Sequence, residues 1–170
     1  MHQNHALLGA DIRVDALVLT GGATDPVPHA KTMRFSNVHD DERLPLDDVL
    51  IYHGPAVDFL DLAIWVSRDR DGSLELAGLL ERELTTPAVQ AAGAQVAELV
   101  LTAPHAAAAV AVLSAGAVVV NTAYRMLSGV VGPGIGLYRT SWLAQEQFGI
   151  GRHVRRAQGF SFTLLVEPVI

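Results

Sequence analysis

A long block with almost no charge limits what this chain can fold into. Between Pro87 and Tyr124 the single charged residue is Glu98, and most of the stretch is alanine or valine. A helix that is apolar all round must be buried against something else. Small residues such as Gly93 and Gly116 would let two such helices pack closely. The block therefore predicts a buried, Ala-rich helical hairpin.

Proline and glycine mark the ends of the predicted helices. Thr86 supplies a capping hydroxyl, and Pro87 follows at the first helical position, where its missing N–H is tolerated. A second helix is predicted to begin at Pro104 and to end before Gly129. Leucines at helical spacing precede the block. Together these signals predict a helical insertion over residues 74–128.

A membrane-inserting hairpin is the alternative to a buried one. The apolar block is long enough to span a bilayer. However, it contains His105, Ser114 and Asn121, and no basic flank sets an orientation. The N-terminal residues lack the basic region and apolar run of a signal peptide. We therefore expect a cytoplasmic protein, with a peripheral membrane location as the alternative.

On both sides of this block the apolar residues alternate with the period of a β-strand. Strands are predicted at residues 13–20, 32–38, 49–52, 58–66, 136–143 and 160–166. In the last of these, Phe160, Phe162, Leu164 and Val166 share one face. Strands before and after a helical block are typical of an α+β fold. We predict one domain, residues 1–170, with an antiparallel β-sandwich-like core.

The charge of the chain is negative and uneven. Net charge is −6 at pH 7. Residues 1–86 hold seven Lys+Arg against fifteen Asp+Glu, whereas residues 87–170 hold five against three. A general nucleic-acid binder needs a basic face to replace counterions, so this class is excluded. The chain has no cysteine, which excludes disulfides and thiolate sites.

One short basic run departs from this acidic character. The stretch "GRHVRRAQ" groups Arg152, His153, Arg155 and Arg156, and Arg139 precedes it in the chain. A solvated loop before the last strand is the simplest interpretation. As a functional site, these five residues would form a patch for anionic lipid headgroups or for an acidic protein partner.

The stretch "SRDRDGSLE" places Asp69 and Asp71 two residues apart. An EF-hand with Gly72 as its sixth residue would need a glutamate at the twelfth, where Gly78 stands. The sequence therefore argues against an EF-hand. Helix capping is the structural interpretation, because Asp71 or Ser73 could accept N–H bonds at a helix start.

A second acidic motif adds a third interpretation. Gly22, Thr24, Asp25 and Pro26 form Gly-x-Thr-Asp-Pro, and Asp69 and Asp71 follow a strand. The pair of motifs resembles the end loops of C2 domains, which are β-sandwiches. The resemblance covers residues 11–78 and implies a Ca²⁺ site ligated by Asp25, Asp69 and Asp71. The family's earlier loop aspartate is missing, and the helical block is foreign to the family.

These observations favour a non-enzymatic binding or adaptor module, with calcium-dependent lipid or protein binding through its acidic end loops. A metal-dependent hydrolase that uses the same aspartates with His29 or His53 is one alternative, so the enzyme question stays open. A subunit that docks into a larger assembly through the helical hairpin is the other, suggested by a mean hydropathy of +0.30.

Overall fold

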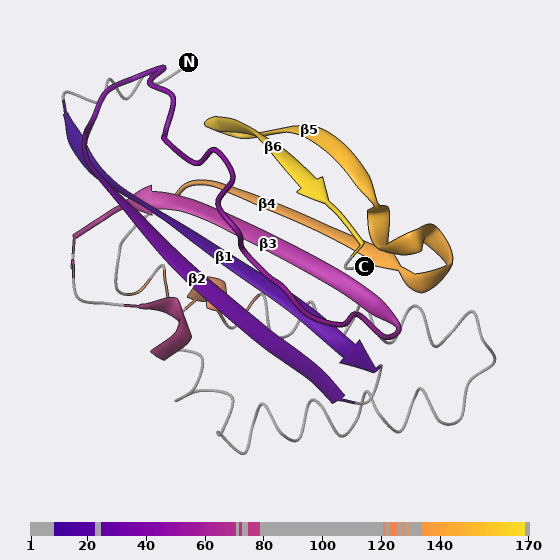
Figure 1. Cartoon of the computed structure of the whole chain (residues 1–170). Helices are drawn as coiled ribbons and strands as arrows, with labels where there is room; N and C mark the ends of the chain where they lie inside the picture. Colours follow the sequence, from indigo (N-terminus) through magenta and orange to yellow (C-terminus); the bar gives the residue numbers. More distant parts are fainter. Residues whose placement is uncertain are drawn as a thin grey trace.

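The computed structural model describes residues 9–22, 25–70, 72, 75–78, 121, 123–125, 127, 129 and 134–168; at residues 21, 22, 25 and 26 it describes the backbone alone. These residues form two antiparallel sheets (Figure 1). The larger sheet has the strand order β2-β1-β3-β4, and β5 pairs with β6. The strands are β1 (Ala10–Gly22), β2 (Asp25–Val38), β3 (Phe59–Arg68), β4 (Gly134–Leu143), β5 (Gly151–Ala157) and β6 (Phe160–Val166), and a 3-10 helix, η1 (Ala144–Gly149), joins β4 to β5.

The two central strands of the larger sheet are buried on both faces. Every residue of β1 from Ile12 to Thr20 is buried, and so is nearly all of β3. The sequence of a strand that is buried on both faces is a nearly continuous run of apolar residues, not a strict alternation of apolar and polar residues. The predicted strand at residues 58–66 is confirmed: β3 runs two residues further and lies between β1 and β4.

Strand β2 is longer than the sequence indicated. The predicted strand began at residue 32, because Pro26 and Pro28 are unusual inside a strand, yet residues 25–31 continue the antiparallel ladder with β1 from Gly22↔Asp25 onward. Since β2 is an edge strand, it has a ladder on one side alone, and proline is tolerated there. Residues 49–52, predicted as a strand, are not one; they belong to the connection between β2 and β3.

The β5–β6 hairpin covers one face of the larger sheet, here called the hairpin-side face. Figure 1 shows the hairpin, in orange and yellow, over this face, which the β2–β3 connection also crosses. The hairpin contributes Phe160, Phe162, Leu164 and Val166, which pack against sheet residues that include Ile12, Val14, Leu62 and Ile64. The predicted inward face of the last strand and a sandwich-like arrangement of two sheets are thus confirmed.

A tight turn places the hairpin close to β4. Gly159, between β5 and β6, has φ +84°, a conformation that suits glycine. A Cβ on Gly136 of β4 would lie 2.0 Å from the carbonyl oxygen of Gln158 in that turn. Any side chain at position 136 would therefore push the hairpin away from the sheet.

The opposite face, here called the helix-side face, packs against helical residues. Leu76, Ala123 and Leu127 join Leu17, Phe59 and Trp65 in one buried cluster. Most of the predicted insertion 74–128, including the hairpin core, lies outside the described residues. Among those that are described, no helix has the length and apolar character needed to cross a membrane.

The hairpin-side core provides a first test. Phe162 is half-buried, and its ring meets that of Tyr138 edge-on with centroids 4.9 Å apart. We expect Phe162→Ala to destabilise the protein by about 2 kcal/mol, less than for a fully buried ring. Urea unfolding would measure the change. Thr163→Ala, on the exposed side of the same strand, is the control and should leave stability nearly unchanged. Equal effects would mean that the hairpin does not pack as described.

Candidate functional site

Asp69 is an ion-pair partner rather than an open ligand. It directly follows β3, where its N–H donates to the carbonyl oxygen of Asp11 at 2.8 Å. Its carboxylate accepts a hydrogen bond from Arg34 Nε at 2.9 Å, and Arg13 Nη1 lies 4.0 Å from its other oxygen. The side chain is 8% exposed. One oxygen of this carboxylate thus accepts a hydrogen bond from a guanidinium group, and the other lies at ion-pair distance from a second one.

Asp25, another of the predicted calcium ligands, does not lie beside Asp69. Asp25 pairs with Gly22 at one end of β1, whereas Asp69 bonds to Asp11 at the other end. Eleven residues of strand separate the two ends, roughly 35 Å at about 3.3 Å per residue. Asp25 and Asp69 of one chain cannot bind the same ion, so this pairing of ligands is wrong. Asp71 and the side chain of Asp25 lie outside the described residues.

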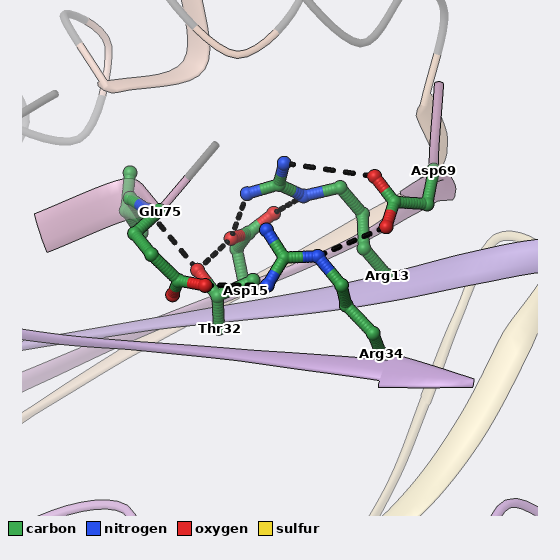
Figure 2. Close-up of polar contacts among 7 residues, drawn as sticks. Arg13, Asp15, Thr32, Arg34, Asp69 and Glu75 are labelled. Atoms are coloured by element: carbon green, nitrogen blue, oxygen red, sulfur yellow. Dashed lines mark hydrogen bonds and ion pairs between the residues drawn. The ribbon is translucent and has the colours of Figure 1, made fainter. Parts of the chain in front are cut away.

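Asp69 belongs to a polar network on the helix-side face that is buried at its centre and partly exposed at its edge, where Arg34 is 27% and Glu75 is 52% exposed (Figure 2). At its centre Arg13 donates to both oxygens of Asp15, from Nε at 2.7 Å and from Nη2 at 2.6 Å, and both side chains are 0% exposed. Thr32, opposite Asp15 on β2, donates to the same carboxylate at 2.6 Å. Its hydroxyl in turn accepts the N–H of Leu76 at 3.1 Å. The network thus ties the start of the helical segment to the sheet.

Arg34 links the two outer carboxylates of this network. It binds Asp69 on one side and Glu75 on the other, as Figure 2 shows. The hydrogen bond with Glu75, followed by the charges of Glu75 and Asp69, raises the pKa of Arg34 against the opposing effect of burial. The guanidinium therefore stays charged wherever the protein is folded. The two arginines and three carboxylates described in this cluster together carry one negative charge.

Sequence reasoning missed Arg13 and Asp15, although a signal was present. In "RVDALVLT" both charges fall on the same strand face as Leu17, while Val14, Ala16 and Val18 occupy the other face. Two opposite charges at i and i+2 of a strand point the same way. Such a pair inside an otherwise apolar strand indicates a buried ion pair, because an unpaired buried charge is too costly.

Arg139 does not belong to the predicted basic patch. It lies in β4 on the helix-side face, across from Ala63. Its guanidinium binds Asp61 of β3, with Nη2 at 2.5 Å and Nε at 3.2 Å from the two carboxylate oxygens. The hairpin arginines are on the other side of the sheet. Grouping Arg139 with them was wrong, because residue spacing does not show which face of a sheet a strand presents.

The remaining four patch residues lie in β5, which was interpreted as a loop, and alternate in direction. His153 and Arg155 share a face with Leu164 and Phe162, toward the sheet. Arg155 donates from Nε to the Tyr138 hydroxyl at 3.1 Å. His153 Nε2 lies 2.6 Å from the carbonyl oxygen of Gly149, and its Nδ1 lies 3.2 Å from Arg155 Nη2. These two side chains hold the hairpin against the sheet and are not free to bind a partner.

Arg152 and Arg156 point outward. They belong to an exposed surface, here called the outer hairpin face, that consists of Arg152, Val154, Arg156, Ser161, Thr163 and Leu165. Val154 is 65% exposed and Leu165 is 57% exposed. No hydrogen bond or ion pair joins Arg152 or Arg156 to another described residue. The face therefore combines two positive charges with two exposed aliphatic side chains and no carboxylate.

The described residues offer few other sites. They contain no group of three or more His, Asp or Glu side chains arranged to hold a metal ion. The His29 ring packs against the Tyr52 ring at an interplanar angle of 44°, with centroids 4.5 Å apart, and His53 is exposed in the β2–β3 connection. A pocket of about 220 Å³ is lined by Trp65, Tyr124, Gln158 and the start of β4, none of which is charged. That volume is below the usual range for small-molecule sites.

Comparison with known proteins adds no relative: no protein-family model, no curated protein and no solved structure matches the chain.

Proposed function

We propose that this chain is a non-enzymatic binding module that docks an acidic protein partner on its outer hairpin face. The observation that carries the proposal is the composition of that face, which has Arg152 and Arg156 beside Val154 and Leu165 and lacks any carboxylate. Arginine is enriched in protein interfaces, where it is combined with apolar contacts. Exposed aliphatic side chains gathered on one face also favour a partner over plain solvation.

A protein partner fits this face better than a lipid surface. Recognition of anionic membranes uses clusters of about four to eight Lys or Arg side chains, and this face has two. The net charge of −6 would also repel an anionic bilayer. At physiological ionic strength charges act over about 8 Å, so two local ion pairs can form despite the overall negative charge.

The hydrolase alternative receives less support. It needs Asp25, Asp69 and a histidine in one site, but Asp25 and Asp69 lie at opposite ends of β1. The C2-like relationship, the complete helical hairpin and calcium dependence stay predictions. A calcium site in this chain would need ligands other than Asp25 with Asp69.

Charge reversal tests the proposed function. The probe is a pool of fluorescein-labelled twelve-residue peptides in which glutamate, valine, leucine and serine occur in random order. We expect ¹⁵N chemical-shift changes on residues 151–166, and at least a tenfold loss of affinity in the double variant Arg152→Glu/Arg156→Glu. The matched control reverses two exposed arginines elsewhere, Arg43→Glu/Arg70→Glu, and should bind as the wild type does.

Two outcomes would contradict the proposed function. One is an absence of shift changes on the hairpin at millimolar peptide. The other is equal loss of affinity in the double variant and its control, which would indicate attraction to any positive charge rather than docking on this face. Binding to vesicles that contain phosphatidylserine is measured in the same way. Tighter binding to vesicles than to peptides would favour the lipid surface and overturn the choice of an acidic protein.

A further inference from the structure

We infer that the outer hairpin face selects an extended acidic segment with carboxylates at positions i and i+4 and an apolar residue at i+2. The inference rests on the proposed function and narrows the class of partner. It follows from the order of side chains along β5, where Arg152, Val154 and Arg156 are consecutive outward residues of one strand.

The spacing of the two arginines sets the geometry. They are four residues apart in an extended strand, so their Cα atoms lie about 13 Å apart at about 3.3 Å per residue. A partner segment in extended conformation repeats at the same distance and also points alternate side chains to one face. Its residues i, i+2 and i+4 would therefore face Arg152, Val154 and Arg156 in register.

A helical partner with carboxylates at the same positions, i and i+4, does not match this spacing. On a helix, side chains at i and i+4 are about 6 Å apart, which is half of the separation between the two arginines. The apolar residue of the face, Val154, also lies midway between the two arginines on β5. Its neighbour across the hairpin is Thr163. An extended segment places its i+2 side chain at this midpoint.

The second strand gives the face a direction. Leu165 lies opposite Arg152, whereas Ser161 lies opposite Arg156. The partner therefore meets an apolar neighbour at one carboxylate and a hydroxyl at the other. The acidic stretch of this chain at residues 39–48, in the β2–β3 connection, does not have the required pattern. Its alternate residues Asp40, Glu42, Leu44, Leu46 and Asp48 never place a single apolar residue between two carboxylates. The occupant is therefore a different protein.

Three seven-residue peptides test the spacing, and the first two have the same composition. Peptide one, Ser-Glu-Ser-Val-Ser-Glu-Ser, has the predicted spacing. Peptide two, Ser-Glu-Ser-Val-Glu-Ser-Ser, places its glutamates on opposite faces of an extended chain. Peptide three is peptide one with aminoisobutyric acid in place of serine, which forces a helix. By fluorescence anisotropy with the whole chain, we expect peptide one to bind at least tenfold more tightly than either of the others.

A charge swap provides the decisive control. The variant Arg152→Glu/Arg156→Glu should lose peptide one and bind Ser-Lys-Ser-Val-Ser-Lys-Ser, which the wild type should not bind. A loss of affinity through misfolding would not produce this reversed preference.

The outcomes separate this inference from the proposed function. Peptides one and two could bind with equal affinity while the chemical-shift changes still fall on the hairpin. That result would contradict the inferred spacing of the partner's carboxylates but would still support docking on the outer hairpin face. Tighter binding of peptide three would favour a helical partner and also overturn the inference. Concentration-dependent dimers of the free chain that the charge swap abolishes would identify a second copy as the occupant, against the inference.

Discussion

Asp15→Ala is expected to destabilise the protein by about 3–5 kcal/mol, because it leaves the buried charge of Arg13 without its partner. Arg13 and Asp15 are both 0% exposed, and the guanidinium binds both carboxylate oxygens. The substitution also removes the acceptor of the Thr32 hydroxyl, which positions the N–H of Leu76. The loss should therefore reach the contact between the sheet and the helical segment.

Urea unfolding followed by circular dichroism measures this change, and the chain supplies a matched control. Arg43 and Asp47 form an ion pair on the surface, with side chains 81% and 74% exposed. Asp47→Ala should change stability by at most about 0.5 kcal/mol, because exposed ion pairs contribute little. A similar small change for Asp15→Ala would contradict the buried position of the pair.

Replacing both members of the buried pair separates two explanations. Arg13→Met/Asp15→Leu removes both charges and roughly keeps the volume, and buried pairs replaced in this way often leave stability unchanged or improved. We expect the double variant to be at least 2 kcal/mol more stable than Asp15→Ala, by the same reasoning. If the double variant is as unstable as Asp15→Ala, the lost hydrogen bond to Thr32, rather than the unpaired charge of Arg13, accounts for most of the loss of stability.

The strands with clear alternation were predictable, and the exceptions have local physical reasons. Phe160–Val166 was predicted with the observed bounds because one apolar face packs on the sheet. The start of β2 was missed because prolines suggest a loop, and nothing in the sequence says that this strand lies at an edge. Strand β5 was missed because its outward and inward positions both carry arginine, so that no contrast in polarity marks its two faces.

The predicted calcium site required that the strand ends next to Asp25 and Asp69 lie side by side. The spacing of residues along the chain does not show which strand ends are neighbours. Both aspartate motifs lie beside strands, and a sandwich could have gathered them at one end. Because β3 is antiparallel to β1, its end lies beside the start of β1, while the β1–β2 turn lies at the far end. Strand order and direction together separate Asp25 from Asp69. Once the order β2-β1-β3 is known, this separation follows without side-chain detail.

The helix-side face can be tested through Phe59, which lies on the side of β3 where apolar and charged residues are mixed. Phe59 shares that side of β3 with Asp61, Ala63 and Trp65, and in the structure it is 2% exposed. It packs in one cluster with Leu17 and Leu19 of β1. An alternation of apolar and charged residues would ordinarily predict exposure of the mixed face. Here Asp61 is paired with Arg139, which makes burial of the whole face feasible.

Phe59→Ala should therefore destabilise the protein by about 3–5 kcal/mol, through the lost burial of the ring and the cavity left behind. Val57→Ala, two residues earlier and 59% exposed, is the control and should change stability by at most about 0.5 kcal/mol. Both are measured by urea unfolding under the same conditions. If Phe59→Ala costs less than about 1 kcal/mol, the helix-side face is open to water in solution. The ion pairs on that face would then also be exposed to water. In that case Asp15→Ala should no longer cause a large loss of stability.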